Sequence, residues 1–132
     1  MIVGVGTDLV TIQRIRTAVD RFGARFLERL YSPREVALCW QRRDPVPCLA
    51  KRFAAKEAFV KALGTGFRQG IWFRDVEVLP DDLGRPRLVI SGCAARQLER
   101  FGMTRTHLSL SDEGGHALAF VVVEGVDQGN RI

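Results

Sequence analysis

Two carboxylates and one lysine in the first half of the chain are the residues best suited to chemistry. Asp8 follows Thr7 in an apolar segment that contains Gly4 and Gly6. An aspartate in this position is either a helix N-cap or turn residue, or a hard oxygen ligand for a cation beside backbone that can be closely approached. The residue type and its position leave both interpretations open.

Glu57 and Lys61 are four residues apart in a segment with helical periodicity, so their side chains lie on one face. The pair can be an ordinary surface ion pair, worth about 0.2–0.5 kcal/mol. However, small residues flank it and allow close approach; they are Ala54, Ala55, Ala58 and Ala62. The loop Gly64-Thr65-Gly66 follows and can offer backbone N–H groups to an anion. A phosphate there requires a cation such as Lys61 or a metal, because the helix dipole is unfavourable at this end.

His107, Ser109 and Ser111 alternate in a segment typical of a strand and therefore share one face. The sequence contains no Gly-x-Ser-x-Gly elbow, and side chains that stand side by side on a strand need not meet as nucleophile and base. A serine hydrolase is disfavoured for these reasons.

Arginine dominates the positive charge of the chain. It accounts for 17 of the 20 basic residues, and the formal net charge is +5. The excess lies in residues 1–66, which have a net charge of +6 against −1 for the remainder. A basic half indicates an anionic partner, which can be nucleic acid, a phosphorylated small molecule or an acidic protein.

One run of arginines has the spacing of a helical stripe: Arg14, Arg21, Arg25 and Arg29. The stripe is either solvated surface or a docking surface for an acidic partner helix. Aromatic residues make up 8% of the chain and stand mostly at core spacings, which disfavours stacking on the bases of single-stranded nucleic acid.

The periodicity predicts the elements that must position these residues. A strand over residues 2–10 ends near Asp8, and two short helices broken at Gly23 follow it. Ser32 and Glu35 form a capping box that starts a helix running to about Arg43. The later elements are a helix over 47–63, strands around 76–78 and 88–90, a helix over 91–101, and a hairpin of 107–111 with 117–124. This order predicts an α+β fold in which an antiparallel sheet packs against helices.

The chain length of 132 residues and the absence of a linker or repeat predict one domain, with a core over about 1–124 and a frayed tail over 125–132. No apolar run approaches the ~20 residues of a membrane-spanning helix, and the N-terminus lacks the pattern of a secretory signal. Cys39, Cys48 and Cys93 have no metal-binding spacing, so we expect reduced thiols and a cytoplasmic location.

Four motifs occur in order along nearly the whole chain. They are residues 4–15 (GVGTDLVTIQRI), residues 49–66 (LAKRFAAKEAFVKALGTG), residues 84–86 (GRP) and residues 107–110 (HLSL). Together they resemble the holo-acyl-carrier-protein synthases, the small bacterial 4′-phosphopantetheinyl transferases. The resemblance implies the 4′-phosphopantetheinyl transferase fold and a role in fatty acid and lipid biosynthesis.

The resemblance also implies a reaction and a site. Such enzymes transfer the 4′-phosphopantetheine arm of coenzyme A to a serine of apo acyl carrier protein, with Mg²⁺, and release adenosine 3′,5′-bisphosphate. It makes Asp8 and Glu57 the Mg²⁺ ligands and Lys61 the catalytic residue beside the phosphate. Nucleotide contacts are implied at Arg52, Gly64, Thr65, Arg85, Pro86 and His107.

The partners that the resemblance implies are coenzyme A, an acidic carrier protein and two further copies of the chain, with sites shared across the subunit interfaces of a homotrimer. Arg14, Arg21 and Arg25 are expected to dock the carrier; neither nucleic acid nor a membrane is expected as a partner. Asp112 is a departure, since many relatives have histidine there, and an aspartate would repel phosphate. The alternative function is a basic module that binds RNA or an acidic protein without catalysis, which has no use for the carboxylates of Asp8 and Glu57.

Overall fold

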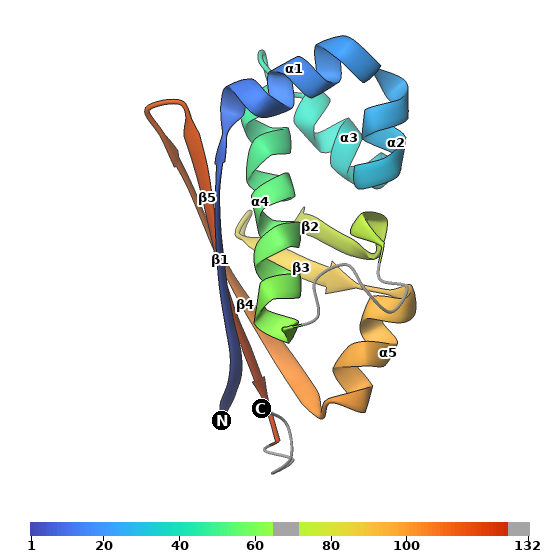
Figure 1. The fold of residues 1–132 in the computed structure, drawn as a ribbon, viewed down its shortest axis with the longest axis vertical. Coiled ribbons are helices and arrows are strands. Elements are labelled where there is room, and N and C mark those ends of the chain that lie inside the picture. Colours follow the sequence, from blue (N-terminus) through green and yellow to red (C-terminus); the bar gives the residue numbers. More distant parts are fainter. Residues whose placement is uncertain (65–71, 127–132) are drawn as a thin grey trace.

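A three-stranded antiparallel sheet forms one side of the structure, which is a computed structural model describing residues 1–64 and 72–126. Its strands are β1 (Ile2–Thr11), β5 (His116–Gly125) and β4 (Met103–Glu113), in the order β1-β5-β4. Helix α4 (Val46–Leu63) packs along one face of this sheet and contacts β1 most extensively (Figure 1).

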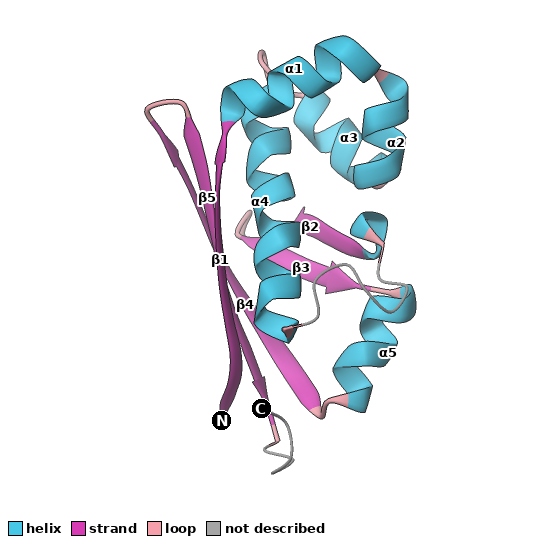
Figure 2. Ribbon diagram, viewed as in Figure 1, coloured by secondary structure: helices cyan, strands magenta, loops and turns pink. Residues whose placement is uncertain are grey.

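The remaining elements surround α4 on the side away from the sheet. Helices α1 (Ile12–Phe22), α2 (Ala24–Leu30) and α3 (Pro33–Trp40) gather at one end (Figure 2). A short 3₁₀ turn (Phe73–Asp75) leads into the hairpin of β2 (Val76–Pro80) and β3 (Pro86–Ile90), and α5 (Gly92–Arg100) follows. This arrangement confirms the predicted α+β fold and antiparallel sheet.

Close contact between β1 and α4 depends on small residues on both elements. A Cβ atom added to Gly4 or Gly6 would overlap the carbonyl oxygen of Ala62 or Ala58, respectively. Protein interiors tolerate such overlap only by moving the backbone. The glycines of the N-terminal motif and the alanines around Glu57 therefore serve one purpose, which is to bring strand and helix backbones together.

Several predicted boundaries are confirmed and three are wrong. The chain breaks at Gly23, whose φ is +54°, and the Ser32–Glu35 capping box is formed. Strand β1 continues to Thr11, because Thr11 still pairs with His116, so Asp8 lies within the strand. Helix α3 ends at Trp40 rather than near Arg43.

The final hairpin is the third difference, since β4 runs over Met103–Glu113 rather than 107–111 and β5 continues past residue 124. Gly125 pairs with Met103 in the sheet, and the Val126 N–H donates to the Gly102 carbonyl at 2.9 Å. The ordered strand therefore extends past the expected end at residue 124. The rest of the expected tail, 127–132, lies outside the described residues.

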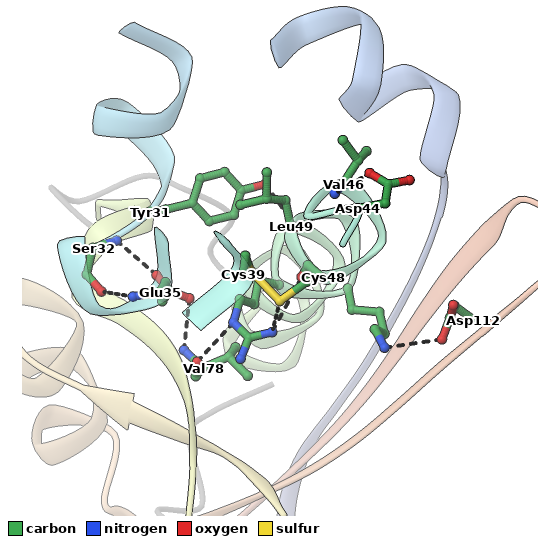
Figure 3. The surroundings of a disulfide bond; sticks show 12 residues. Tyr31, Ser32, Glu35, Cys39, Asp44, Val46, Cys48, Leu49, Val78 and Asp112 are labelled. Carbon is green, nitrogen blue, oxygen red and sulfur yellow. Dashed lines mark hydrogen bonds and ion pairs between the residues drawn. A yellow bond between two sulfur atoms is a disulfide. The ribbon is translucent and has the colours of Figure 1, made fainter. Parts of the chain in front are cut away.

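Cys39 and Cys48 form a disulfide, which corrects the expectation that all three cysteines are reduced. The turn between α3 and α4 reverses the chain and brings the two Cα atoms within 5.4 Å (Figure 3). Both residues are buried, whereas Cys93 takes no part in the disulfide and is partly exposed.

None of the described helices has the length and apolar character that are needed to span a membrane.

Candidate active site

Asp8, Glu57 and Lys61 come together where β1 crosses the C-terminal half of α4. The Lys61 Nζ donates to Asp8 Oδ1 at 3.1 Å and to the Thr7 carbonyl at 3.0 Å. Glu57 lies one helical turn earlier on α4. The carboxyl group of Asp8 is on the face of the sheet that α4 covers, since its neighbours Gly6 and Val10 on that face are buried.

Electrostatics disfavour the ionised form of Glu57. Burial first, and then the negative charge of Asp8, raise the pKa of Glu57, while Lys61 and Arg14 act in the opposite direction. Two carboxylates whose charges interact disfavour simultaneous ionisation, so a cation between them is stabilising. The site therefore has the charge balance of one that receives a cation.

The donor set fits Mg²⁺. Carboxylate oxygens are the ligands it prefers, and it commonly takes one or two from protein while substrate phosphates and waters complete the octahedron. The described residues contain no cluster of three or more His, Cys, Asp and Glu side chains suited to a metal. Asp8 and Glu57 thus suit a metal ion that arrives with a phosphorylated substrate better than a metal ion that is held by protein ligands alone.

Arg14 connects the carboxylates to an apolar groove. Its guanidinium lies 5.3 Å from the centre of the Phe53 ring, and Phe53 stacks on Phe73 with ring centres 5.9 Å apart. Phe73 in turn lines a groove of about 770 Å³ between α2 and the 3₁₀ turn. The described residues that line it are Phe22, Arg25, Phe26, Glu28, Arg29, Leu30, Trp72, Phe73 and Arg74.

The arginines predicted to dock a partner lie on this side of the molecule. Arg14, Arg21 and Arg25 are exposed, and Arg25 lines the groove. Arg21 stands over the ring of Phe22 at 5.7 Å. The interruption at Gly23 divides the predicted stripe between α1, which carries Arg14 and Arg21, and α2, which carries Arg25 and Arg29.

Arg52 is buried instead of facing a ligand. Its Nε donates to the Val78 carbonyl at 3.2 Å, and its Nη1 donates to the carbonyl of Cys48 at 3.4 Å and to the Cys48 sulfur at 3.0 Å. Burial is the largest effect on its pKa and lowers it. The structure therefore does not bring Arg52 together with Asp8 and Glu57.

The other residues implied for the nucleotide are dispersed. Arg85 and Pro86 are at the turn of the β2–β3 hairpin, where Arg85 pairs with Asp81. Gly64 ends α4 in the left-handed conformation, and Thr65 lies outside the described residues. His107 is on β4 and pairs with Glu124.

His107 and Asp8 are on opposite faces of the sheet. His107 is opposite Val122 and shares the outer face with Val5, whereas Asp8 shares the inner face with the buried Ala119. Within one chain the sheet separates them.

Sequence reasoning missed two ion pairs of α4. Lys56 is fully buried against Glu35, and Lys51 pairs with Asp112 at 3.2 Å. The second pair neutralises the aspartate that departs from the common pattern. Lys56 could have been noticed because its neighbours at positions 52, 53, 55, 59 and 60, three or four residues away or adjacent, include the apolar Phe53, Ala55, Phe59 and Val60 of the buried side of the helix.

The structure is thus an α+β scaffold that brings two carboxylates and a lysine together. Residues 4–121 match the family described as the 4′-phosphopantetheinyl transferase superfamily. The chain is 52% identical over 129 residues to the holo-[acyl-carrier-protein] synthase of Magnetococcus marinus, a match covering 94% of each protein. The chain belongs to the 4′-phosphopantetheinyl transferase superfamily.

Solved structures agree with this assignment. The crystal structure of holo-[acyl-carrier-protein] synthase from Neisseria meningitidis is 45% identical, with a TM-score of 0.87 over 94% of this chain and 99% of that one. The enzyme from Helicobacter pylori in complex with coenzyme A is 34% identical, with a TM-score of 0.81 over 91% of this chain and 99% of that one.

Proposed function

We propose that this chain transfers the 4′-phosphopantetheine arm of coenzyme A to a serine hydroxyl of an apo acyl carrier protein. The observation that carries the proposal is the cluster of Asp8, Glu57 and Lys61 in a chain of this superfamily. In the reaction the serine oxygen forms a bond to the phosphorus that bears pantetheine. The bond from that phosphorus to the bridging oxygen breaks, and adenosine 3′,5′-bisphosphate leaves.

Asp8 and Glu57 would hold Mg²⁺, which supplies charge neutralisation for the pyrophosphate. We assign to Lys61 the stabilisation of the charge that develops on the leaving phosphate, and its ion pair with Asp8 supports this assignment. Lys61 can also give that oxygen a proton. A carboxylate of the pair, or a water beside it, takes the proton of the serine hydroxyl.

The nucleotide contacts in this proposal are Arg52, Gly64, Thr65, Arg85, Pro86 and His107. Arg52 is buried and already uses Nε and Nη1 within the protein, so its contact with the nucleotide rests on the motif resemblance alone. Lys51 supports the placement of a nucleotide near Asp112. Its ion pair neutralises the carboxylate of Asp112 and so reduces the repulsion between that aspartate and the nucleotide.

A second copy of the chain is part of this proposal, because His107 and Asp8 cannot meet within one subunit. The outer face of the sheet exposes large apolar side chains, including Leu9 at 63% and Phe120 at 40%. Exposed apolar patches of this kind mark association surfaces. We propose a homotrimer in which this face is covered and His107 joins the carboxylates of a neighbouring subunit.

Carrier docking is assigned to Arg14, Arg21 and Arg25, with the groove beside them receiving an apolar side chain. Opposite charge accelerates and orients such encounters. The contacts of Arg14 with Phe53 and of Phe53 with Phe73 support this placement. They link the groove to Arg14, whose charge acts on Glu57, so a carrier docked in the groove would lie near Glu57.

Replacing Arg21 and Arg25 together by alanine is expected to raise the KM for the carrier about tenfold at low salt and to leave the KM for coenzyme A unchanged. The effect should shrink as salt increases, because exposed charges are screened over about 10 Å at 0.1 M. Steady-state kinetics at several salt concentrations measure it. Arg96→Ala on α5, which removes an exposed arginine elsewhere, is the control; a change in the KM for coenzyme A alone would refute the docking assignment.

The experiment that tests the activity is intact-mass measurement. The chain is incubated with coenzyme A, Mg²⁺ and an apo acyl carrier protein, and the carrier should gain about 340 Da, the mass of the transferred arm. EDTA in excess of Mg²⁺ should abolish the gain. No gain with several carriers, together with tight and salt-sensitive RNA binding, would instead favour a basic binding module.

We place the reaction in the cytoplasm, where coenzyme A is available as donor. Disulfides are uncommon in reducing compartments, so the state of Cys39 and Cys48 reports on this placement. Thiol alkylation at the moment of cell lysis, read by mass, gives that state directly.

A further inference from the structure

The ammonium of Lys56 lies where three segments of the fold meet. It donates to Glu35 Oε1 at 2.7 Å, to the Val76 carbonyl at 2.6 Å and to the Phe73 carbonyl at 3.0 Å. An ammonium has three hydrogens, so these bonds satisfy it fully. Its exposed fraction is 0%, which excludes contact with a substrate.

Glu35 extends the network into the other two segments. Its Oε1 also accepts from the Ser32 N–H at the start of α3, and its Oε2 accepts from the Val78 N–H in β2. The two side chains thus connect α4, α3 and the strand that follows Phe73. Figure 3 shows the Glu35 end of this network beside Ser32 and Val78.

Stability alone does not account for a buried ion pair of this kind. Removing two charges from water costs about as much as their attraction returns, and apolar residues of similar volume commonly stabilise a protein as well or better. The pair differs from an apolar contact in having directed hydrogen bonds, which fix the distance and rotation of one element against another.

The two positions fixed by Lys56 are the two that the proposed reaction must bring together. Glu57 is the next residue on α4, and Lys61, one turn further along, pairs with Asp8. Phe73, whose carbonyl Lys56 holds, stacks on Phe53 and lines the groove. A rigid connection between them sets the distance from the docked carrier to the carboxylates.

We propose that Lys56, with Glu35, is a positioning residue that keeps the carrier groove in register with the catalytic carboxylates. The inference rests on the proposed function, since it assigns the groove to the carrier. A misplacement of about 1 Å can cost a reaction about 10²-fold, which is the scale of effect that loss of this connection should have.

The test uses the double variant Glu35→Gln with Lys56→Met, which removes both charges and keeps the size of both side chains. Per folded molecule, we expect the KM for the carrier to rise about tenfold and kcat to fall about tenfold. Unfolding curves measured in the same buffer give the folded fraction. If the double variant does not fold, the single variant Glu35→Gln is measured instead. It should raise the KM for the carrier and lower kcat, each by about threefold.

Arg34→Ala is the matched control. Arg34 makes a bidentate ion pair with Glu77, at 2.7 and 3.2 Å, and so also joins α3 to β2 without involving α4 or Phe73. This variant should lose stability but keep both kinetic constants. A purely structural role for Lys56 predicts the same behaviour for both variants.

Trp72 provides a second readout, because it lies next to Phe73 and lines the groove. In a Trp40→Phe background, the emission of Trp72 should shift in the double variant and stay unchanged in Arg34→Ala. Unchanged kinetic constants per folded molecule with unchanged emission would overturn the inference. Failure of the wild-type chain to modify any carrier would overturn the proposed function instead, so the two failures are distinguishable.

Discussion

Replacing Glu57 by glutamine is expected to reduce transfer at least about 10³-fold, because it removes one of the two carboxylates proposed for Mg²⁺ and leaves only Asp8. The same variant should be at least as stable as the wild type. Burial and the charge of Asp8 raise the pKa of Glu57, which means that folding disfavours its ionised form. A neutral amide of the same shape escapes that penalty at neutral pH, where the wild-type carboxylate must be charged.

The measurement is kcat/KM from the intact-mass assay alongside the midpoint of thermal unfolding. Glu77→Gln provides the opposite case. Burial is the largest single effect on the Glu77 carboxyl and raises its pKa, but hydrogen bonds from Arg34 and Ser32 prevail and the net shift is downward. Folding thus favours its charged form above the unfolded pKa, so this variant should lose stability and keep activity. Near-normal transfer by Glu57→Gln would remove the metal role, and a lower unfolding midpoint for it would contradict the electrostatic account.

Local rules predicted the pair of Glu57 and Lys61, whereas only the resemblance of the motifs joined Asp8 to that pair. The four-residue spacing places Glu57 and Lys61 on one face of α4, and glycines opposite alanines allow β1 to approach that face. Helix boundaries at Gly23 and Ser32 follow in the same way from the conformational preferences of single residues.

Long-range pairing explains what local rules missed. Alternation shows that His107 and Ser109 share a face, but only the register of β4 and β1 on β5 reveals that this face is opposite to that of Asp8. The end of β1 at Thr11 likewise depends on its partner His116, which is more than 100 residues away in the sequence.

Buried polar groups show the same limit. A lysine in an amphipathic helix is expected at the surface, and Lys56 is buried only because Glu35 and two carbonyl groups from other segments meet it. Cys39 and Cys48 similarly become neighbours through the turn between α3 and α4, which sequence spacing alone does not determine.

Mixing two inactive variants is expected to restore transfer if the site is shared between subunits. Glu57→Gln lacks a carboxylate on the inner face of the sheet, and His107→Ala lacks the imidazole on the outer face. Each should be inactive or nearly so alone; losing a hydrogen bond to a charged phosphate costs about 1.5–3 kcal/mol, or up to roughly 10²-fold.

In a mixed trimer, a site built from one subunit's Glu57 and its neighbour's His107 is intact whenever both contributing subunits carry the wild-type residue. Random assembly of equal amounts therefore gives about a quarter of the sites intact. The two variants are denatured together and refolded as a mixture, and transfer is compared with that of each variant refolded alone. Refolded wild type sets the scale.

A site confined to one chain predicts no recovery, since every subunit then lacks one of the two groups. Full activity of His107→Ala by itself would instead refute the role of His107. A Phe120→Arg substitution added to both variants distinguishes recovery by assembly from any other cause, because a charge on the apolar outer face should prevent association. With that substitution, the mixture should sediment as monomers and the recovered transfer should disappear.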